Sequence, residues 1–353
     1  MIEIAPVAPR STPIRWLRLL PWLAAVVVLA LLLWRIPLDE VLAAVGRGPV
    51  GWLALYSLFE AVAVLPADAW ATRVTLSAAG VKRPFGELFL VRGSTYLLNV
   101  LSYAVGQGGL GVYLARTGVR AARSAGIVLF LLATNAIALA LVAAVAHPFA
   151  QRTDARAAIA IGVVLYGVKT YLTALAARGL FARTRFGRWM ATHLEKEPVA
   201  TLARAGLLGH LKATAARIPH VAVLLLVLWG SFRVWGIEVP LGVGLAALPA
   251  VVLIAALPIT PSGLGTAQAL QVLLFAPFVA GATPAARSAT LLGFSLVHHA
   301  LGLAGQVAVG AVCFMLLKRR GIPALAGSPA GNDRPAEDSE EPTPKEGAAE
   351  PGK

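Results

Sequence analysis

Three long uncharged runs constrain this chain more than any other feature. Residues 124–146, 239–286 and 288–317 contain no Asp, Glu, Lys or Arg. Each run is long enough to cross a bilayer as a helix, which takes roughly 20 apolar residues. Only 14% of the 353 residues are charged, against about a quarter in soluble domains, and the mean hydropathy is +0.75. We therefore expect an all-α fold, a polytopic helical membrane protein.

Six segments are predicted to cross the membrane completely: residues 17–36, 49–66, 124–146, 157–177, 219–237 and 289–317. A signal peptide is the competing interpretation of the first, because Arg10, Arg15 and Arg18 precede its apolar run, residues 19–34. The run is long for such a peptide, and Arg35-Ile36-Pro37 follows it where small residues would mark a cleavage site. A retained first span is therefore favoured.

The predicted transmembrane domain covers residues 17–320. Residues 1–16 are expected to form a cytoplasmic N-terminal segment. The tail, residues 327–353, is rich in Pro, Gly, Ala and Glu and cannot bury apolar surface, so we predict that it is disordered.

Basic residues predict the orientation, because cytoplasmic loops carry an excess of Lys and Arg. The longest internal loop, 178–218, holds Arg178, Arg183, Arg185, Arg188, Lys196, Arg204, Lys212 and Arg217. This loop and both termini are therefore predicted to be cytoplasmic. The net charge of +14 lies in short loops, which fits topology signals and contacts with anionic lipid head groups better than nucleic acid.

Residues 88–118 cannot cross the membrane once, because every later loop would then change sides and the basic loop would face outward. Their uncharged part, 93–115, is too short for two crossings. We therefore predict a re-entrant hairpin that breaks at the sequence GQGGLG, residues 106–111. Residues 239–283 resemble this segment and break at LPITPSGLGTAQ, residues 257–268, although their length would also permit two full crossings.

Both predicted breaks contain Gly-Leu-Gly, and the loop charges make the two hairpins enter from opposite faces. Opposed broken helices are typical of inverted repeats in transporters, so an inverted repeat is our hypothesis.

The glycines of the first break, Gly106, Gly108 and Gly111, match the spacing of a dinucleotide-binding turn. That turn needs a βαβ unit and an acidic residue about 20 positions later. Here the flanks are membrane helices and the next acidic residue is Asp154, so this interpretation is excluded.

A broken helix in the membrane presents free N–H groups and a positive dipole end, which favour an anion such as phosphate. Close helix packing is the alternative reason for the glycines. The residues that we expect to bind a substrate are Asn99, Gln107, Gly109, Gly111, Arg116, Lys169, Pro261, Gly263, Gly265 and Gln268.

Other polar residues leave two interpretations open. Lys169 either faces a cavity, with Glu60 as its counter-charge, or extends to the cytoplasmic surface. Arg92 and Arg116 either meet lipid phosphates at the cytoplasmic mouth or serve as interfacial anchors. The adjacent histidines 298 and 299 point in different directions on a helix, so helix-packing hydrogen bonds are favoured over a shared metal.

Motifs of enzymes and cofactor sites are missing. The sequence has no H-E-x-x-H, no G-x-S-x-G, no P-loop and no paired carboxylates within a span. Cys313 is its only cysteine, which excludes intrachain disulfides and cysteine-cluster metal sites. We expect no catalytic residues, no metal and no cofactor.

These residues resemble the transmembrane region of lysylphosphatidylglycerol synthases and its stand-alone, flippase-like relatives. The resemblance covers most of residues 15–320. It rests on Asn99, the glycine run and Arg116, the helix from Ser124, and PITPSGLGTAQ, which is similar to the family's Pro-x-x-Pro-Gly-Gly-Leu-Gly-x-x-Glu. Gln268 stands where the family has glutamate, Ser262 replaces a glycine, and the first break has Tyr103 and no glutamate.

The resemblance implies movement of a phospholipid or lipid-linked molecule between leaflets of a bacterial inner membrane. We expect the head group to bind between the two broken helices, and membrane lipids with anionic head groups to be the partners. The alternatives are a secondary transporter of a small anionic solute and a non-catalytic scaffold for a lipid-modifying enzyme. The near absence of acidic residues from the spans argues against proton or sodium coupling.

Overall fold

The computed structural model describes residues 20–149, 199–257 and 259–322. These residues form helices and contain no β-strand, which confirms the all-α, polytopic fold. The predicted N-terminal segment, the span 157–177 with Lys169, and the tail 327–353 lie outside the described residues.

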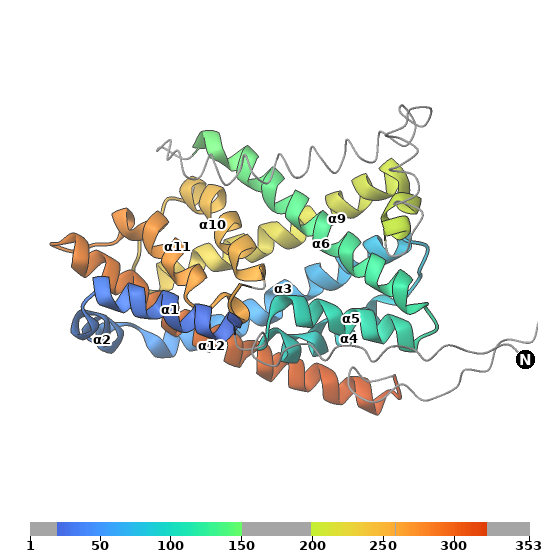
Figure 1. Cartoon of the computed structure of the whole chain (residues 1–353), viewed down its shortest axis with the longest axis horizontal. Coiled ribbons are helices and arrows are strands. Elements are labelled where there is room, and N and C mark those ends of the chain that lie inside the picture. The colour runs from blue at the N-terminus through green and yellow to red at the C-terminus, as the bar shows by residue number, and fades with distance from the viewer. Residues whose placement is uncertain (1–19, 150–198, 258, 323–353) are drawn as a thin grey trace, which may run out of the picture.

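Four long helices form the body of the molecule (Figure 1): α3 (Val50–Ala78), α6 (Ala121–Ala146), α9 (Val199–Val234) and α12 (Pro284–Arg319). Within the described residues, these four contain the stretches that are long and apolar enough to cross a membrane singly. A bent pair, α1 (Leu20–Arg35) and α2 (Leu38–Arg47), could supply a fifth span, with an angle of 92° between its parts. Pro37 lies at the bend, because proline disfavours a helical residue before it.

Two of these helices extend by ten residues or more beyond their predicted bounds. Helix α3 continues past Pro66 to Ala78, so residues expected outside the membrane helix lie within it. Helix α9 begins at Val199, so residues 199–218, expected in a loop, are helical, with a break at Gly206 (φ 63°). The prediction failed there because the charges of this segment were read as exposed.

Two hairpins of short helices lie between the long helices. Helices α4 (Phe85–Asn99) and α5 (Tyr103–Arg116) pack against each other, as do α10 (Leu241–Ala256) and α11 (Thr266–Phe275). At about 1.5 Å per residue, none of the four is long enough to cross a hydrocarbon core of about 30 Å. Three short 3₁₀ turns, His147–Phe149, Pro261–Gly263 and Ala276–Phe278, complete the described elements.

The same order of elements occurs twice and in opposite directions. A long helix, a hairpin and a second long helix form α3 to α6, and the same set forms α9 to α12. Figure 1 shows the two hairpins entering from opposite ends of the molecule and meeting near its middle. Equivalent pairs also pack alike, since α3 contacts α12 as α9 contacts α6. This is the arrangement of an inverted repeat.

The first hairpin turns at a different place from the one predicted. Its break is residues 100–102, and the glycine run lies inside α5. Ser102 caps α5 by accepting a hydrogen bond from the Val105 N–H at 3.2 Å. A Cβ on Gly106 would lie 3.0 Å from Asn99 Cγ and 3.3 Å from the Thr95 carbonyl, so close packing of α4 on α5 explains this glycine.

The second hairpin turns where it was expected to. Gly263 and Gly265 have φ of 75° and 86°, the left-handed region that glycine tolerates best. The Gln268 Oε1 accepts a hydrogen bond from the Gly265 N–H at 2.6 Å, which closes the start of α11. The two tips meet directly, because the Ser262 hydroxyl lies 2.7 Å from the Asn99 carbonyl and 2.9 Å from the Val100 carbonyl.

We predict that Gly263→Ala destabilises the fold more than Gly236→Ala. Both residues have positive φ, which costs a residue with a side chain about 1–2 kcal/mol. A Cβ on Gly236 meets nothing within 4 Å, whereas one on Gly263 lies 2.6 Å from Ala255 Cα. The thermal unfolding midpoints of the two purified variants in detergent measure this difference. Equal decreases in the midpoint would contradict the packing described for the second tip.

Candidate functional site

A cavity of about 320 Å³ lies where the two hairpin tips meet. Asn99 and Tyr103 line it from the first hairpin, and Ser262, Ala267 and Gln268 line it from the second. Long helices complete the wall, and their polar contributions are Ser57, Glu60, Asp68, Asn135, His220, Ser295, His298, His299 and Gln306. The cavity therefore presents a set of polar groups within a lining that also contains many apolar side chains.

A buried ion cluster forms one part of the wall. The Asp68 carboxylate accepts from Arg92 Nε at 2.6 Å and from Arg217 Nη1 at 2.5 Å. Arg92 also donates to Gln107 Oε1 at 3.1 Å, and Arg217 donates to Thr72 Oγ1 at 3.2 Å. Asp68, Arg92 and Arg217 are 2–3% exposed, so protein groups replace most of the water that would solvate these charges.

The charges of this cluster do not cancel. Two guanidinium groups and one carboxylate sum to +2 − 1 = +1. A positive charge at this burial is costly unless it has a counter-ion. Arg92 and Asp68 line the cavity, so an anion placed there would reach the excess charge.

A second buried pair lies on the same cavity. His298 Nε2 of α12 is 2.8 Å from Glu60 Oε2 of α3. The His298 ring stacks on the Phe294 ring, with 5.5 Å between the ring centroids. Glu60 Oε1 is buried and has no hydrogen-bond partner among the described residues. The predicted role of His298 in helix-packing hydrogen bonds fits this contact with α3.

Several amide oxygens of the cavity lining also lack donors within the described part of the chain. They belong to Asn99, Asn135 and Gln271. The amide nitrogen of Asn99 already has a partner, since Nδ2 donates a hydrogen bond to Gln306 Oε1 at 3.0 Å. Buried polar atoms in proteins nearly always have a partner, so this lining suits a polar ligand or ordered water.

The structure brings some of the predicted binding residues together. Asn99 and Gln268 line the cavity, and Gln107 holds Arg92. Pro261, Gly263 and Gly265 shape the second tip without lining the cavity themselves.

Other predicted binding residues lie away from the cavity. Gly109 and Gly111 are inside α5, so their N–H groups do not begin a helix, and the prediction that they do is wrong. Arg116 ends α5, one residue before Thr117, whose carbonyl accepts from Arg83 at 2.9 Å. The interfacial anchor proposed as one role of Arg92 is also wrong, because Arg92 is 3% exposed.

Sequence reasoning missed Asp68, Arg217 and His220 as parts of one site. Asp68 was placed beyond the end of a span, and Arg217 was counted in a loop. A charge flanked by apolar residues for a helical turn on each side was the available signal. Within the described residues there is no group of three or more His, Cys, Asp or Glu that could hold a metal ion.

The chain belongs to the family described as "Lysylphosphatidylglycerol synthase TM region", which matches residues 21–310. The match includes both hairpins and the cavity between them. A comparison with curated proteins found no match.

We predict that Asp68→Asn lowers stability far more than Arg92→Gln. The first change leaves two buried guanidinium groups without a carboxylate. Removing one partner of a buried ion pair typically lowers the free energy of unfolding by about 3–5 kcal/mol. The second leaves the contact of Asp68 with Arg217 in place. Unfolding midpoints of the detergent-purified variants measure the difference, and similar midpoints would show that the cluster does not hold the helices together.

Proposed function

We propose that this protein moves a phospholipid or lipid-linked molecule between the leaflets of a bacterial inner membrane. The head group would pass through the cavity between the hairpin tips, with its phosphate beside Arg92. The excess positive charge of the Asp68, Arg92 and Arg217 cluster is the observation that carries this proposal. No enzymatic step is part of it.

Helix ends strengthen the attraction for an anion. Tyr103 begins α5 and lines the cavity, and Ala267, the second residue of α11, lines it from the other hairpin. Two helix N-termini therefore face the same space, and each carries a partial positive charge of roughly half a unit.

The size of the cavity favours a head group over a whole lipid. A volume of 320 Å³ is at the lower end for ligand pockets, which span about 300–1,000 Å³. It suits a phosphate with a small polar substituent, while the acyl chains would remain among the exposed apolar side chains of the helices. The amide oxygens of Asn135 and Gln271 would accept hydrogen bonds from that substituent.

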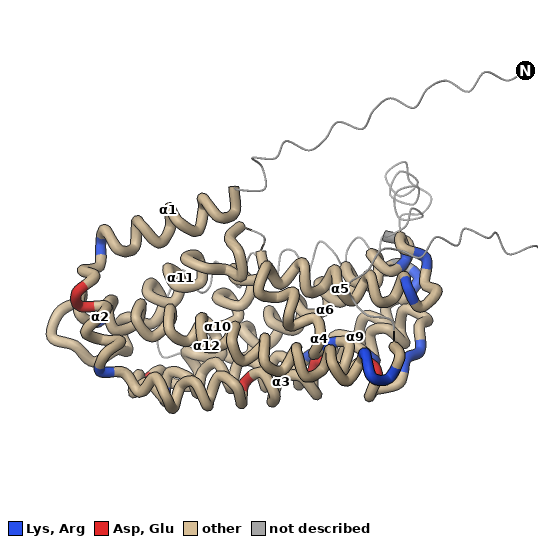
Figure 2. The backbone as a smooth tube through the Cα atoms, turned by 90° about the horizontal axis from the view of Figure 1, so that it is seen from below, with Lys and Arg blue, Asp and Glu red and all other residues tan. Residues whose placement is uncertain are grey.

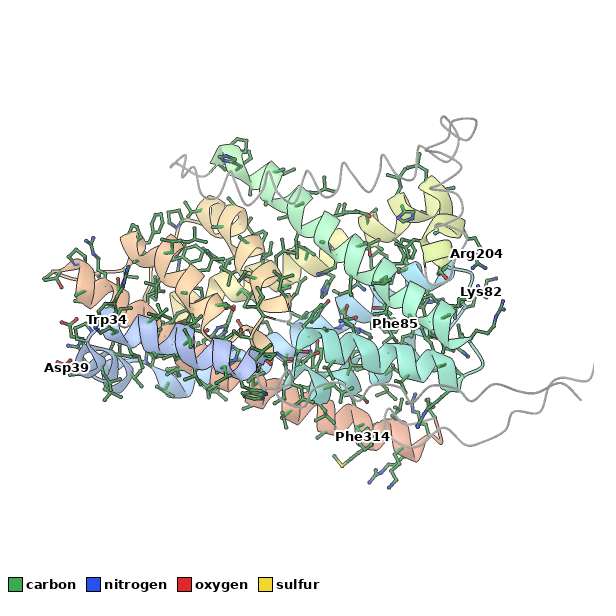
Figure 3. The ribbon with its side chains drawn as sticks, in the orientation of Figure 1. Trp34, Asp39, Lys82, Phe85, Arg204 and Phe314 are labelled. Carbon is green, nitrogen blue, oxygen red and sulfur yellow. The ribbon has the colours of Figure 1, made fainter. Side chains whose placement is uncertain are left out.

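The charge distribution supports a cytoplasmic position for one end of the molecule. Lys and Arg gather at the end where α3, α5 and α12 finish, and Figure 2 shows this concentration. Lys82 and Arg204 lie at that end, whereas Asp39 lies at the other (Figure 3). By the positive-inside rule, the basic end and the end of α12 would face the cytoplasm.

We predict that the purified protein exchanges fluorescent phosphatidylglycerol between the leaflets of liposomes. Arg92→Gln should slow this exchange at least tenfold, because it removes the excess charge and leaves Asp68 paired with Arg217. Chemical quenching of the outer leaflet follows the exchange, since only unquenched lipid in the inner leaflet remains fluorescent.

Arg73→Gln is the matched control, because it removes one exposed positive charge from α3 outside the cavity. It should exchange lipid at the wild-type rate. Absence of exchange by the wild-type protein for both anionic and zwitterionic lipids would contradict the proposal and favour the solute transporter or the scaffold. An Arg92→Gln variant as fast as wild type would remove the proposed phosphate site.

The orientation can be tested with single cysteines. Cys313 is buried, and after its replacement by Ala a cysteine is introduced either at Lys82 or at Asp39. In intact cells, we predict that a membrane-impermeant maleimide labels the Asp39→Cys protein and labels the Lys82→Cys protein only after lysis. The reverse pattern would contradict the orientation.

A further inference from the structure

The pair of Glu60 and His298 takes no part in the phosphate site described above, yet it lines the same cavity. Glu60 is on α3 and His298 is on α12, so the pair joins the two inverted halves across 238 residues of sequence. Their side chains are 10% and 12% exposed. An ionisable pair at such depth in a membrane protein calls for an explanation beyond packing.

We propose that this pair is a proton-binding site and that it couples lipid movement to a proton gradient. The proposal rests on the proposed function. It also revises the argument from sequence against proton coupling, because two acidic residues, Glu60 and Asp68, lie within α3 and line the cavity.

The pair has the chemistry of a proton site. Histidine is the side chain whose charge ordinarily changes between about pH 5 and 8. The 2.8 Å contact lets one proton be shared between Nε2 and Oε2, and the buried Oε1 has no partner in the described ranges. The cavity supplies the path by which a proton reaches the pair.

Other titratable groups line the same cavity or interact with a residue that does. Tyr56 and Asp68 share α3, His299 shares α12, Arg92 and Tyr96 come from α4, Tyr103 comes from α5, and His220 and Arg217 come from α9. Helices α6, α10 and α11 contribute no Asp, Glu, Lys, Arg or His to the cavity wall.

A count of these charges explains the coupling. With the tyrosines, His220 and His299 neutral, Arg92 and Arg217 contribute +2, and Asp68 and Glu60 contribute −2, so the site without a proton has zero net charge. A proton on the pair raises the sum to +1, which matches the single negative charge of a phosphodiester. Proton and head group therefore strengthen each other's binding, and this coupling is reciprocal. The two would cross together and carry no net charge.

The test uses the full-length protein in phosphatidylcholine liposomes that contain a trace of fluorescent phosphatidylglycerol. Under a gradient of one pH unit, we expect the labelled lipid to accumulate in the leaflet that faces the alkaline side. One proton per lipid sets a limit of about tenfold, the equilibrium ratio that one pH unit supports. At equal pH on both sides, exchange continues without accumulation.

Glu60→Gln is the decisive variant. It removes the shared proton and leaves the Asp68, Arg92 and Arg217 cluster at +1. Accumulation under the gradient, measured relative to the exchange that the variant retains at equal pH, should therefore be lost. His147→Gln is the matched control, since it also replaces one histidine, and His147 neither lines the cavity nor contacts Glu60. This control should accumulate lipid as the wild type does.

Two results would overturn the proposal: exchange by the wild type that ignores the pH gradient, or undiminished accumulation by Glu60→Gln. A wild type without any exchange contradicts the proposed function instead. In that case infrared difference spectra of the purified protein between about pH 5 and 8 test the site alone. We expect a change in the carboxyl region that Glu60→Gln abolishes, and its absence from the wild type would overturn the proton site.

Discussion

The contact of Asp68 with Arg92 and Arg217 is the interaction on which the rest of the structure depends. It joins α3 to the first hairpin and to α9, the leading helix of the second inverted half. Charges at this burial are stable only when they are paired and hydrogen-bonded. Removing the carboxylate would leave the hairpin with an uncompensated charge at its inner side. The cluster therefore positions the hairpin and also supplies the positive charge of the cavity.

The hairpins impose the second constraint. A helix that stops inside a membrane exposes backbone groups that hydrocarbon cannot satisfy. In this fold the tips satisfy part of that need mutually, since Ser262 of one tip donates to the carbonyls of Asn99 and Val100 of the other. Asn99, Tyr103 and Gln268 of the tips line the cavity. Polar groups at the centre of the molecule are thus a consequence of ending four short helices where the two tips meet.

Hydropathy and the parity of loop charges predicted most of the fold. Long uncharged runs predicted α6 and α12. The first hairpin was predicted because the basic loops had to stay on the cytoplasmic side of the membrane. The position of its turn could not be predicted, because glycines serve both breaks and close packing. Here Ser102 caps the helix and Gly106 packs against α4. At the second tip, positive φ at Gly263 and Gly265 makes the glycine signal correct.

The site was less accessible to prediction than the fold. Its central ion pairs join residues 24 and 149 positions apart, and no local pattern encodes such distances. Arg217 in particular looked like a loop residue, because a basic segment surrounds it in the sequence. Only the packing of α9 against α3 reveals that this arginine is a core residue. Gln107 was predicted to bind the substrate, and in the structure it accepts a hydrogen bond from the Arg92 guanidinium.

An experimental structure of the protein in nanodiscs that contain phosphatidylglycerol would show whether a lipid phosphate binds beside Arg92 between the two tips. We expect head-group density in the cavity, with a phosphate within hydrogen-bonding distance of Arg92. Lipid density confined to the outer surface of the helices, with only water between the tips, would contradict it.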